Sequence, residues 1–311
     1  MGHYTVIGSG SIGRRHYENL TRLGADARLL GWRDLNAETL ADALEGATGA
    51  VIATATDIRL APLQAAAERG VALYIEKPLA FRSSDLKALM DAAAPVAERS
   101  VAGFMMRYHP AVRALYDDPI EAFRFHFEIG HDVREWRQNW RFAESYAAKP
   151  EGGGVLLDLC HEIDMAACLF PGLDVTSVDA IGHRDFPGVD FATRLTMAQG
   201  ANHGAVAMDY LSPKFIRRLS LRGRDEGLDL DLLNCRQTRW KGTKETTRDW
   251  DFDRNDMFLG IMGDFMALAE GRTPSDNPLL PRLDRVGESS GLIAKAWETR
   301  RFTGEITGGF T

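Results

Sequence analysis

The sequence predicts an α/β protein of two domains, a doubly wound parallel sheet followed by an α+β domain with a large, mostly antiparallel sheet. Three observations lead to this fold class. A glycine-rich turn, Gly8-Ser9-Gly10-Ser11-Ile12-Gly13, follows a short apolar run near the start of the chain. Short apolar runs then alternate with helical patterns through the first third of the sequence. After Pro119 the pattern changes, and apolar and polar residues alternate one by one.

The first third of the chain predicts parallel βαβ units. Five apolar runs are expected to be strands, at residues 4–7, 27–30, 50–53, 71–75 and 101–104. A helix is expected after the glycine turn, another at residues 61–69, ended by Gly70, and a third at residues 84–94. Strands that alternate with helices at this spacing pair in parallel, and right-handed crossovers then give a doubly wound sheet.

The rest of the chain predicts a different kind of sheet. Apolar residues at 123, 125, 127 and 129 alternate with Arg124, His126 and Glu128, the period of a strand with one buried face. Similar strands are expected at residues 189–197, 206–210, 219–221 and 228–232, and helices at 155–170, 257–270 and 285–297. The boundary falls near residues 114–119, which divides the chain into domains of residues 1–116 and 117–311.

Composition narrows the class of protein. The chain has 311 residues, of which 45% are hydrophobic, and a net charge of −7 with both signs mixed, so no basic patch indicates nucleic-acid binding. No apolar run approaches the roughly 20 residues that span a bilayer. No signal-peptide pattern precedes the strand at Tyr4, and the three cysteines suggest no disulfide framework. A cytoplasmic protein with small-molecule ligands is therefore expected.

The glycine turn predicts a dinucleotide site. In a strand–turn–helix context, Gly8 makes the tight turn, Gly10 lets the backbone approach a pyrophosphate, and Gly13 permits close packing of helix on strand. The helix N-terminus, with Ser11 and Ile12, meets the negative charge. These features are typical of a Rossmann domain that binds a nicotinamide dinucleotide. Thr54, Glu76 and Lys77 follow later strands and are predicted to line the same cofactor site.

The end of the second strand bears on the choice between NAD and NADP. An acidic residue that binds the ribose of NAD is expected there, but Trp32 occupies its place. Arg33 could contact a 2′-phosphate and stack on adenine, which favours NADP(H) modestly. Two alternatives stay open: Arg33 is a surface arginine, or Asp34 reaches the ribose hydroxyls.

Two segments supply candidate catalytic residues. Lys77 lies between Glu76 and Pro78, at the carboxyl edge of the parallel sheet, where ligands bind in open α/β folds. An ammonium next to an oxidised nicotinamide ring meets a like charge, which suits it to proton transfer. The alternative is an ordinary surface lysine.

The second segment is the helix predicted at residues 155–170, after a triple glycine at 152–154. On a helical wheel Asp158, His161, Glu162 and Met165 lie opposite an apolar face. Asp158 could orient His161, and His161 could exchange a proton with a substrate hydroxyl. The alternative is an amphipathic helix with a solvated polar face. A metal site is rejected, because the adjacent residues Cys160, His161 and Glu162 point apart on a helix.

Substrate contacts are expected from aromatic and arginine side chains. Trp136, Arg137 and Tyr146 lie between the first antiparallel strand and the triple glycine. Aromatic rings pack on the apolar faces of sugars, and arginines bind carboxylate or phosphate. A core or subunit interface is an equal alternative for the tryptophans Trp136 and Trp140. Arg107 follows the fifth strand and is expected near the cofactor or substrate.

Together these motifs resemble the glucose–fructose oxidoreductase/inositol dehydrogenase/MocA family. The resemblance covers nearly the whole chain and rests on these motifs, which occur in the family's order: Gly8 to Gly13 with Arg14-Arg15-His16, Glu76-Lys77-Pro78, Gly103-Phe104 to Arg107-Tyr108-His109-Pro110, the triple glycine with Asp158, His161 and Asp164, and Asn255-Asp256-Met257 with Phe265. It implies a second domain with an open sheet, a homodimer or homotetramer, and NAD(P)-linked chemistry on a sugar or cyclitol. It also implies that Lys77, His161 and Asp158 form the catalytic set.

Three departures from the family pattern concern the site. His161 follows Asp158 by three residues, where four are usual in the family. Met105-Met106 replace the family's usual asparagine, and Arg59 replaces a histidine. The predicted function is an NAD(P)-dependent dehydrogenase or reductase of a sugar-like alcohol. The alternatives are a reductase of an imine or unsaturated ring, and a non-catalytic sensor that binds dinucleotide.

Overall fold

The chain forms two structural units, and the computed structural model describes residues 2–135 and 141–308. The first unit comprises Met1–His109 and Asp253–Ser290, and the second Pro110–Phe252 and Gly291–Thr311. The expected boundary at residues 116 and 117 thus lies a few residues late. The expected second domain is not continuous, because residues 253–290 return to the first unit.

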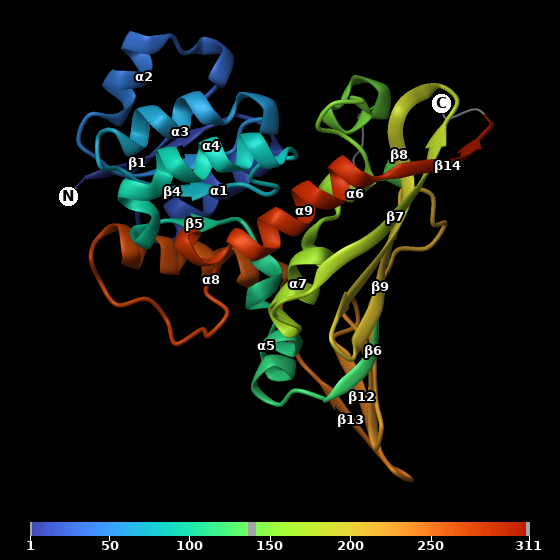
Figure 1. Cartoon of the computed structure of the whole chain (residues 1–311). Coiled ribbons are helices and arrows are strands. Elements are labelled where there is room, and N and C mark those ends of the chain that lie inside the picture. The colour runs from blue at the N-terminus through green and yellow to red at the C-terminus, as the bar shows by residue number, and fades with distance from the viewer. Residues whose placement is uncertain (1, 136–140, 309–311) are drawn as a thin grey trace. The chain divides into compact units, whose positions relative to one another are not determined.

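A five-stranded parallel sheet organises the first unit, as predicted (Figure 1). Its order is β2-β1-β3-β4-β5, with every neighbouring pair parallel. The strands are β1 (His3–Ile7), β2 (Ala27–Leu30), β3 (Ala47–Ile52), β4 (Ala72–Ile75) and β5 (Val101–Ala102). The connecting helices are α1 (Ser11–Arg22), α2 (Ala37–Leu44), α3 (Leu60–Ala67) and α4 (Ser83–Ala93).

Helix α8 (Arg254–Ala269) belongs to the first unit because it completes the apolar core there. Its buried residues, including Ile261 and Phe265, pack in one cluster with Tyr4, Val51 and Tyr74 of the parallel strands. The Tyr4 hydroxyl also donates a hydrogen bond of 2.7 Å to Glu270, just beyond the helix. This late segment therefore covers one face of a sheet built from the start of the chain.

The second unit contains a nine-stranded sheet of order β13-β12-β11-β10-β6-β9-β8-β7-β14. Only the pairs β6–β9 and β7–β14 are parallel, so the sheet is mostly antiparallel, as predicted. The strands are β6 (Ala122–Gly130), β7 (Asp174–His183), β8 (Phe186–Gln199), β9 (Asn202–Asp209), β10 (Ile216–Gly223), β11 (Glu226–Asp231), β12 (Arg236–Lys241), β13 (Lys244–Asp249) and β14 (Arg301–Ile306).

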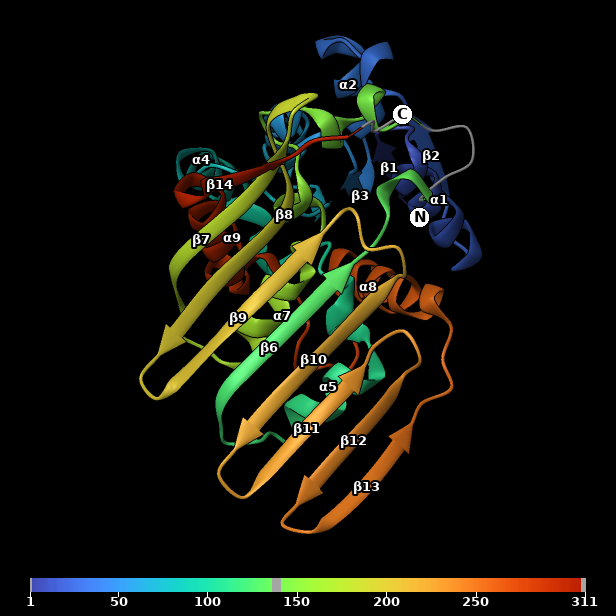
Figure 2. The same cartoon turned by 90° about the vertical axis from the view of Figure 1, so that its right-hand side faces the viewer.

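The described helices of the second unit cover one face of its sheet, and none of them covers the other. Helices α5 (Pro110–Asp117), α6 (Val155–Asp158) and α7 (His161–Leu169) lie behind the strands in Figure 2, whose central strands face the reader uncovered. Helix α9 (Gly287–Thr299) begins in the first unit and continues in the second. The covered face carries the apolar residues of β6, Phe125, Phe127 and Ile129.

The structure corrects the prediction of one helix at residues 155–170. Two short helices replace it, because Leu159 leaves the helical conformation with φ −105° and ψ 26° and α7 starts again at His161. Strands β7 and β12 to β14 and helices α2 and α5 were not predicted. The sequences of β12 to β14 are mostly polar, and their residues are half or fully exposed, so they lack the apolar periodicity that identifies a strand from sequence.

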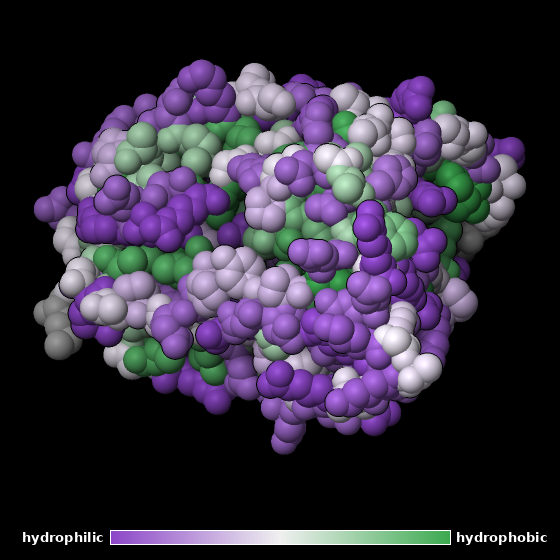
Figure 3. All heavy atoms as spheres, turned by 60° about the horizontal axis from the view of Figure 1, so that its bottom comes forward, coloured by the Kyte–Doolittle hydropathy of each residue, from purple (hydrophilic) through white to green (hydrophobic). Residues whose placement is uncertain are grey.

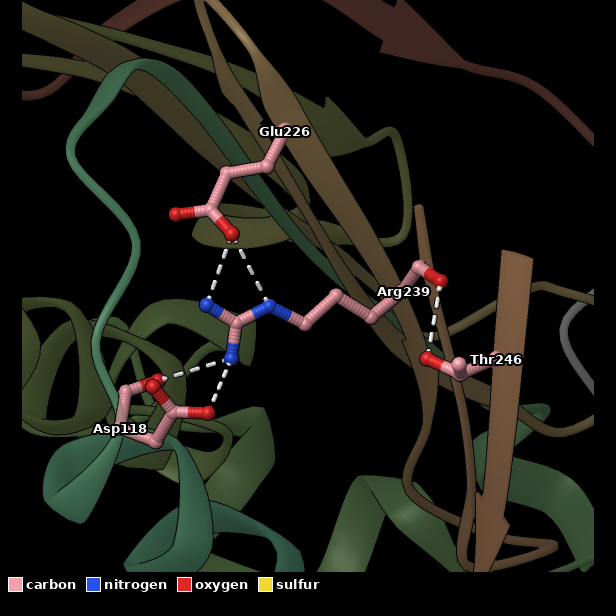
Figure 4. Close-up of polar contacts among 4 residues, drawn as sticks. All are labelled: Asp118, Glu226, Arg239 and Thr246. Carbon is pink, nitrogen blue, oxygen red and sulfur yellow. Dashed lines mark hydrogen bonds and ion pairs between the residues drawn. The ribbon is translucent and has the colours of Figure 1, made fainter. Parts of the chain in front are cut away.

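A group of polar contacts around Arg239 connects strands β11, β12 and β13 to the end of α5 (Figure 4). The Arg239 guanidinium on β12 contacts Glu226 of β11 at 2.8 Å and also pairs with the Asp118 carboxylate. Thr246 on β13 donates to the Arg239 carbonyl at 3.2 Å. These contacts link three strands and a helix end.

The described helices include none that is both long and apolar enough to cross a membrane. Figure 3, which brings the bottom of Figure 1 forward, shows hydrophobic residues in separate patches among hydrophilic ones on that face. One continuous cluster of apolar side chains lies inside the first unit, between its sheet and α8.

Candidate functional site

The glycine turn has the close packing that its three glycines require. Gly8 adopts φ +118°, and a Cβ there would lie 2.5 Å from the Ala53 carbonyl oxygen. A Cβ on Gly13 would lie 1.8 Å from the Gly8 carbonyl oxygen. A Cβ on Gly10, in contrast, would meet no heavy atom of the described chain within 4 Å. The turn is thus packed tightly against β3 but is open above Gly10, which fits the approach of a pyrophosphate.

Helix α1 begins at this opening with free N–H groups. Its N-cap is Gly10, which provides no side-chain cap, and the first residue whose N–H bonds within the turn is Arg14, to the Gly10 carbonyl at 2.9 Å. The N–H groups of Ser11, Ile12 and Gly13 therefore precede the helical hydrogen bonds. Their partial positive charge stabilises an anion at this point.

Replacement of Gly13 by alanine is expected to weaken dinucleotide binding about tenfold or more, equal to about 1.4 kcal/mol. The added Cβ would lie 1.8 Å from a backbone oxygen, so the turn must move to accept it. Fluorescence titration with NADH and NADPH measures the effect. Gly263→Ala is a matched control, because a Cβ at this position in α8 meets nothing within 4 Å. Equal affinities for the Gly13 variant and the wild type would contradict the assignment of the turn.

The strand order places this turn at a topological switch point. Strand β1 lies between β2 and β3, so its two neighbours are reached by connections on opposite sides, and ligands bind at the carboxyl ends there. Thr54 follows β3 at this edge and is 7% exposed. No group within residues 2–135 and 141–308 hydrogen-bonds its Oγ1 atom. A buried hydroxyl without a protein partner at this edge fits a bound polar ligand.

The end of β2 places an acidic side chain near the glycine turn. Residues Trp32–Asp34 form a short 3-10 turn, and Asp34 bends back over Gly31. A Cβ on Gly31 would lie 2.3 Å from Asp34 Oδ2 and 3.3 Å from Ser9 Oγ. Trp32 is half-buried, and Arg33 and Asp34 are both exposed. The sequence left the orientation of Asp34 open, and the structure directs its carboxylate toward Gly31.

Glu76 joins the end of β4 to helix α1. Its Oε1 atom lies 2.7 Å from Nε2 of the buried His16, whose ring packs on Tyr74. Burial opposes ionisation of Glu76, but His16 and the charges of Lys77 and Arg59 outweigh it, so the pKa of Glu76 lies below its ordinary value. The pair connects the helix of the glycine turn to the residue before Lys77.

Stability is expected to depend on Glu76 in acid. A carboxyl group with a lowered folded pKa contributes stability above its ordinary pKa of about 4.5, which is lost as pH falls through the folded pKa. Glu76→Gln should therefore flatten the acid limb of a plot of unfolding free energy against pH, measured with urea. The exposed Glu18→Gln is the control. Parallel curves for the wild type and Glu76→Gln would contradict this linkage.

Arg59 joins the loop after β3 to the loop after β4 at this edge of the sheet. It is 3% exposed, and its guanidinium donates to the backbone carbonyls of Thr54, at 2.9 Å, and of Glu76 and Pro78. Lys77 therefore lies between two carbonyl groups that one buried side chain holds. Sequence reasoning noted Arg59 only as a replacement for a family histidine. Its place between β3 and α3, in a connection that leaves the carboxyl edge of the sheet, was the sequence signal that could have shown it.

Arg107 lies inside the first unit. It is 6% exposed, its guanidinium donates to Ser289 at 3.1 Å and lies above the Phe104 ring, and its carbonyl accepts from Asn277. These contacts give Arg107 a role in packing residues 277–290 against the parallel sheet. Its predicted contact with substrate stays a prediction.

In the second unit a buried aspartate holds the start of α6. Asp190 on β8 accepts from the Leu156 N–H at 2.8 Å and from the Thr193 hydroxyl at 2.9 Å. Gly154 adopts φ +94°, and a Cβ there would lie 2.0 Å from Asp190 Oδ1. Burial raises the pKa of Asp190. The absence of a side chain at Gly154 therefore leaves room for the Asp190 carboxylate. The sequence did not indicate this role, because Asp190 lies far from the triple glycine along the chain.

Two tyrosines bind the predicted catalytic aspartate. The Tyr146 hydroxyl donates to Asp158 at 2.5 Å, and the Tyr210 hydroxyl at 3.1 Å. Burial, together with the charge of Asp158, raises the pKa of Tyr210 far above its ordinary value, so Tyr210 remains a donor. Tyr146, predicted as a substrate contact, is about half exposed and thus connects a surface loop to Asp158.

His161 begins α7 in a largely buried environment, where it is 6% exposed. The next residue, Glu162, is 1% exposed and pairs with Arg217 of β10 at 2.6 Å. Met165 is fully buried. The predicted solvated or cleft-facing stripe is therefore wrong for Glu162 and Met165, because one is tethered to the sheet and the other lies in the core.

The structure brings together some of the predicted residues. Gly8, Gly10, Gly13 and the residues Thr54, Glu76 and Lys77 share the carboxyl edge of the parallel sheet. In the second unit Asp158 meets Tyr146. Trp136, Arg137 and Trp140 lie outside the described residues.

A curated protein shows similarity to part of the chain. Inositol 2-dehydrogenase 3 from Saccharopolyspora erythraea is 30% identical over 128 residues. This alignment covers 35% of the chain and spans 38% of the relative's length. No family model matches the sequence.

Solved structures share the fold over nearly the whole chain. An inositol dehydrogenase homolog from Azotobacter vinelandii, complexed with NAD+, has a TM-score of 0.75 at 14% identity and covers 95% of both chains. UDP-N-acetylglucosamine 3-dehydrogenase from Acidithiobacillus ferrooxidans has a TM-score of 0.71 at 18% identity, covering 95% of this chain and 99% of its own. A 3-ketoreductase from Actinomadura kijaniata, in complex with NADP, has a TM-score of 0.74 at 14% identity and covers 99% of both chains. These likenesses confirm the predicted fold class.

Proposed function

We propose that this chain belongs to the glucose–fructose oxidoreductase/inositol dehydrogenase/MocA family and is an NAD(P)-dependent oxidoreductase acting on a CH–OH group of a sugar, cyclitol or sugar derivative. One observation carries the proposal: Lys77 follows β4 at the same sheet edge as the open glycine turn. The names of proteins with this fold, which include inositol and sugar-nucleotide dehydrogenases, support the substrate class.

The first unit would hold the dinucleotide. The open space above Gly10 and the N–H groups of Ser11 and Ile12 fit the pyrophosphate, and Thr54 offers a buried hydroxyl. When bound, the nicotinamide would supply or accept the hydride. Lys77 would hold or release the proton of the substrate hydroxyl at its Nζ atom. Arg59 and Glu76 would keep the Lys77 segment in place through their backbone and side-chain contacts.

The second unit would contribute His161 and Asp158. We assign His161 to moving the hydroxyl proton and to binding substrate, with Asp158 in support. The two tyrosine hydroxyls on Asp158 fix the orientation of its carboxylate. A carboxylate that accepts hydrogen bonds from two phenol hydroxyls is suited to orienting its neighbours. Trp136, Arg137, Tyr146 and Arg107 remain the proposed substrate contacts.

We propose that the cofactor is NAD(H), against the NADP(H) preference that Arg33 alone suggested. The Asp34 carboxylate turns back toward Gly31 and Ser9, where it can accept from ribose hydroxyls and would repel a 2′-phosphate. Arg33 and Asp34 are both exposed, so the proposal rests on the direction of the Asp34 carboxylate and not on burial. We also propose a cytoplasmic homodimer or homotetramer.

Wild-type protein is expected to bind NAD more tightly than NADP, and Asp34→Asn is expected to remove most of this preference. Dissociation constants from calorimetric titration measure it, and Arg33→Ala serves as the comparison because it removes the neighbouring cation only. Tighter NADP binding that disappears in Arg33→Ala would establish the opposite preference.

A substrate panel tests the proposed activity. The protein is mixed with NAD or NADP and with myo-inositol, levoglucosan, free sugars and nucleotide-linked sugars, and the absorbance of reduced nicotinamide is followed. Reduction of the cofactor by at least one alcohol is expected. Tight dinucleotide binding with no reduction across the panel would favour the alternative of a non-catalytic sensor.

A further inference from the structure

A buried ion pair connects the start of helix α7 to the sheet of the second unit. Nε of Arg217 donates to Oε1 of Glu162 at 2.6 Å, and both side chains are buried. Arg217 lies on β10, an interior strand, opposite Ile129 of β6. Its carbonyl accepts a hydrogen bond of 2.9 Å from the Leu232 N–H. The guanidinium therefore extends from a fixed point of the sheet to the residue that follows His161.

The N-cap of α7 gives the start of this helix little support. The helix begins again after the break at Leu159, and the N-cap residue, Cys160, makes no capping hydrogen bond from its side chain to the described residues of the helix. Met165 in the second turn is fully buried, but a methionine side chain is flexible and fits more than one packing arrangement. The hydrogen bond between Glu162 and Arg217 is directional, so it can set the rotation of α7 about its axis.

Stability alone does not explain an ion pair at this buried position. Two charges lose their hydration when they are buried, and apolar side chains of similar volume often give equal or greater stability. The helix dipole favours an acidic residue in the first turn of α7, but that effect does not require Arg217. A charged hydrogen bond has a preferred direction, whereas an apolar contact does not. The pair therefore suits a place where the direction of a neighbouring side chain matters.

His161 is the neighbour whose direction the pair would set. Successive residues of an α-helix point about 100° apart around its axis, so a fixed direction of Glu162 also fixes the direction in which His161 leaves the helix. Asp158 lies before the break and is held separately, by the hydroxyl groups of Tyr146 and Tyr210. The two residues proposed to act on the substrate hydroxyl are therefore oriented by two different sets of contacts.

We propose that Glu162 and Arg217 are positioning residues that direct the imidazole of His161 toward the substrate hydroxyl. Their role rests on the proposed function, because it acts through His161. Neither residue is assigned a contact with the reacting atoms. Loss of the pair would slow the proton transfer and leave the binding of the dinucleotide unchanged, because the first unit would hold that cofactor.

The double variant Glu162→Met/Arg217→Met tests this proposal, because it removes both charges and keeps most of the side-chain volume. Its kcat on the best substrate of the panel is expected to fall about 10- to 100-fold, the effect of a small misplacement of a reacting group. The dissociation constant of the dinucleotide and the unfolding temperature should stay close to those of the wild type. Glu226→Met/Arg239→Met removes a partly buried ion pair between β11 and β12 and is the matched control, with wild-type kcat expected.

The single variant Glu162→Gln separates positioning from stability. It keeps an acceptor oxygen for the Arg217 guanidinium but leaves the buried positive charge uncompensated, which destabilises a fold strongly. We therefore expect Glu162→Gln to unfold at a lower temperature than the double methionine variant and yet to have a higher kcat. Activities that follow the order of the unfolding temperatures, or a double variant that unfolds well below the wild type, would mean that the pair only supports the fold and would overturn the proposal.

NMR signals of isotope-labelled histidine rings report the position of His161 without an activity assay. The His161 signals, identified by their absence in His161→Gln, are expected to shift or broaden in the double methionine variant, to change less in Glu162→Gln and to stay unchanged in the control. Unchanged His161 signals or wild-type kcat in the double methionine variant would overturn the proposal. If no substrate of the panel reacts with the wild type, the proposed function fails, and the His161 signals still decide whether the pair fixes the ring.

Discussion

Lys77→Ala is expected to lower kcat about 10²- to 10⁴-fold, the range typical of a lost general acid or base. The dissociation constant of the dinucleotide should change little, because the glycine turn and Thr54 are untouched. Lys77 has this effect because it follows β4 at the edge where the cofactor would bind. Steady-state kinetics on the best substrate of the panel, with a titration of the cofactor, measure both quantities.

A second lysine in the same unit provides the control. Lys87 is exposed and pairs with Asp91 on the surface of α4, so Lys87→Ala should leave kcat unchanged. Near-normal turnover in Lys77→Ala would contradict the role of Lys77. A loss of cofactor binding that accounts for the whole effect would make it a binding residue.

Arg59→Met is expected to lower the free energy of unfolding by about 3–5 kcal/mol, the range for removing one partner from a buried charged contact. The variant leaves three buried carbonyl oxygens, on Thr54, Glu76 and Pro78, without their shared donor. Urea unfolding of the wild type and the variant measures the loss. Arg59→Lys keeps the positive charge but not the planar guanidinium with its several N–H donors. It should therefore recover only part of the lost free energy of unfolding.

The control for Arg59 is another arginine that donates to a carbonyl. Arg69 contacts the Ala65 carbonyl at 2.9 Å on the surface, and Arg69→Met should cost well under 1 kcal/mol. Equal losses of unfolding free energy in the Arg59 and Arg69 variants would show that the buried contacts of Arg59 contribute no extra stability. Variants of Arg59 that stay folded should also bind dinucleotide more weakly, because Thr54 and Lys77 would lose their fixed positions.

Local patterns predicted the elements that are apolar and regular. The glycine turn and the five apolar runs specify the parallel sheet, because β1, β3, β4 and β5 are mostly buried and the strands follow one another at short intervals. The alternation of Phe125, Phe127 and Ile129 likewise predicts β6. The resemblance added the expectation of an open sheet, which the structure confirms.

Long-range contacts explain what sequence reasoning missed. Helix α8 joins the first unit through Phe265, which packs on Tyr4 and Tyr74 far away in sequence. The two tyrosines on Asp158 come from a loop and from a point just beyond β9, and Asp190 reaches α6 from β8. The spacing of apolar residues along the sequence does not predict such long-range contacts. The break at Leu159 also has no glycine or proline to mark it.

The central claim is that this chain moves a hydride between a sugar-like alcohol and a nicotinamide. Incubation with NAD and a substrate deuterated at its CH–OH carbons, followed by mass spectrometry of the dinucleotide, tests it most directly. The account predicts reduced dinucleotide that carries one deuterium from the substrate, formed by the wild type and not by Lys77→Ala. Tightly bound dinucleotide that stays oxidised and free of deuterium with every substrate of the panel would contradict it.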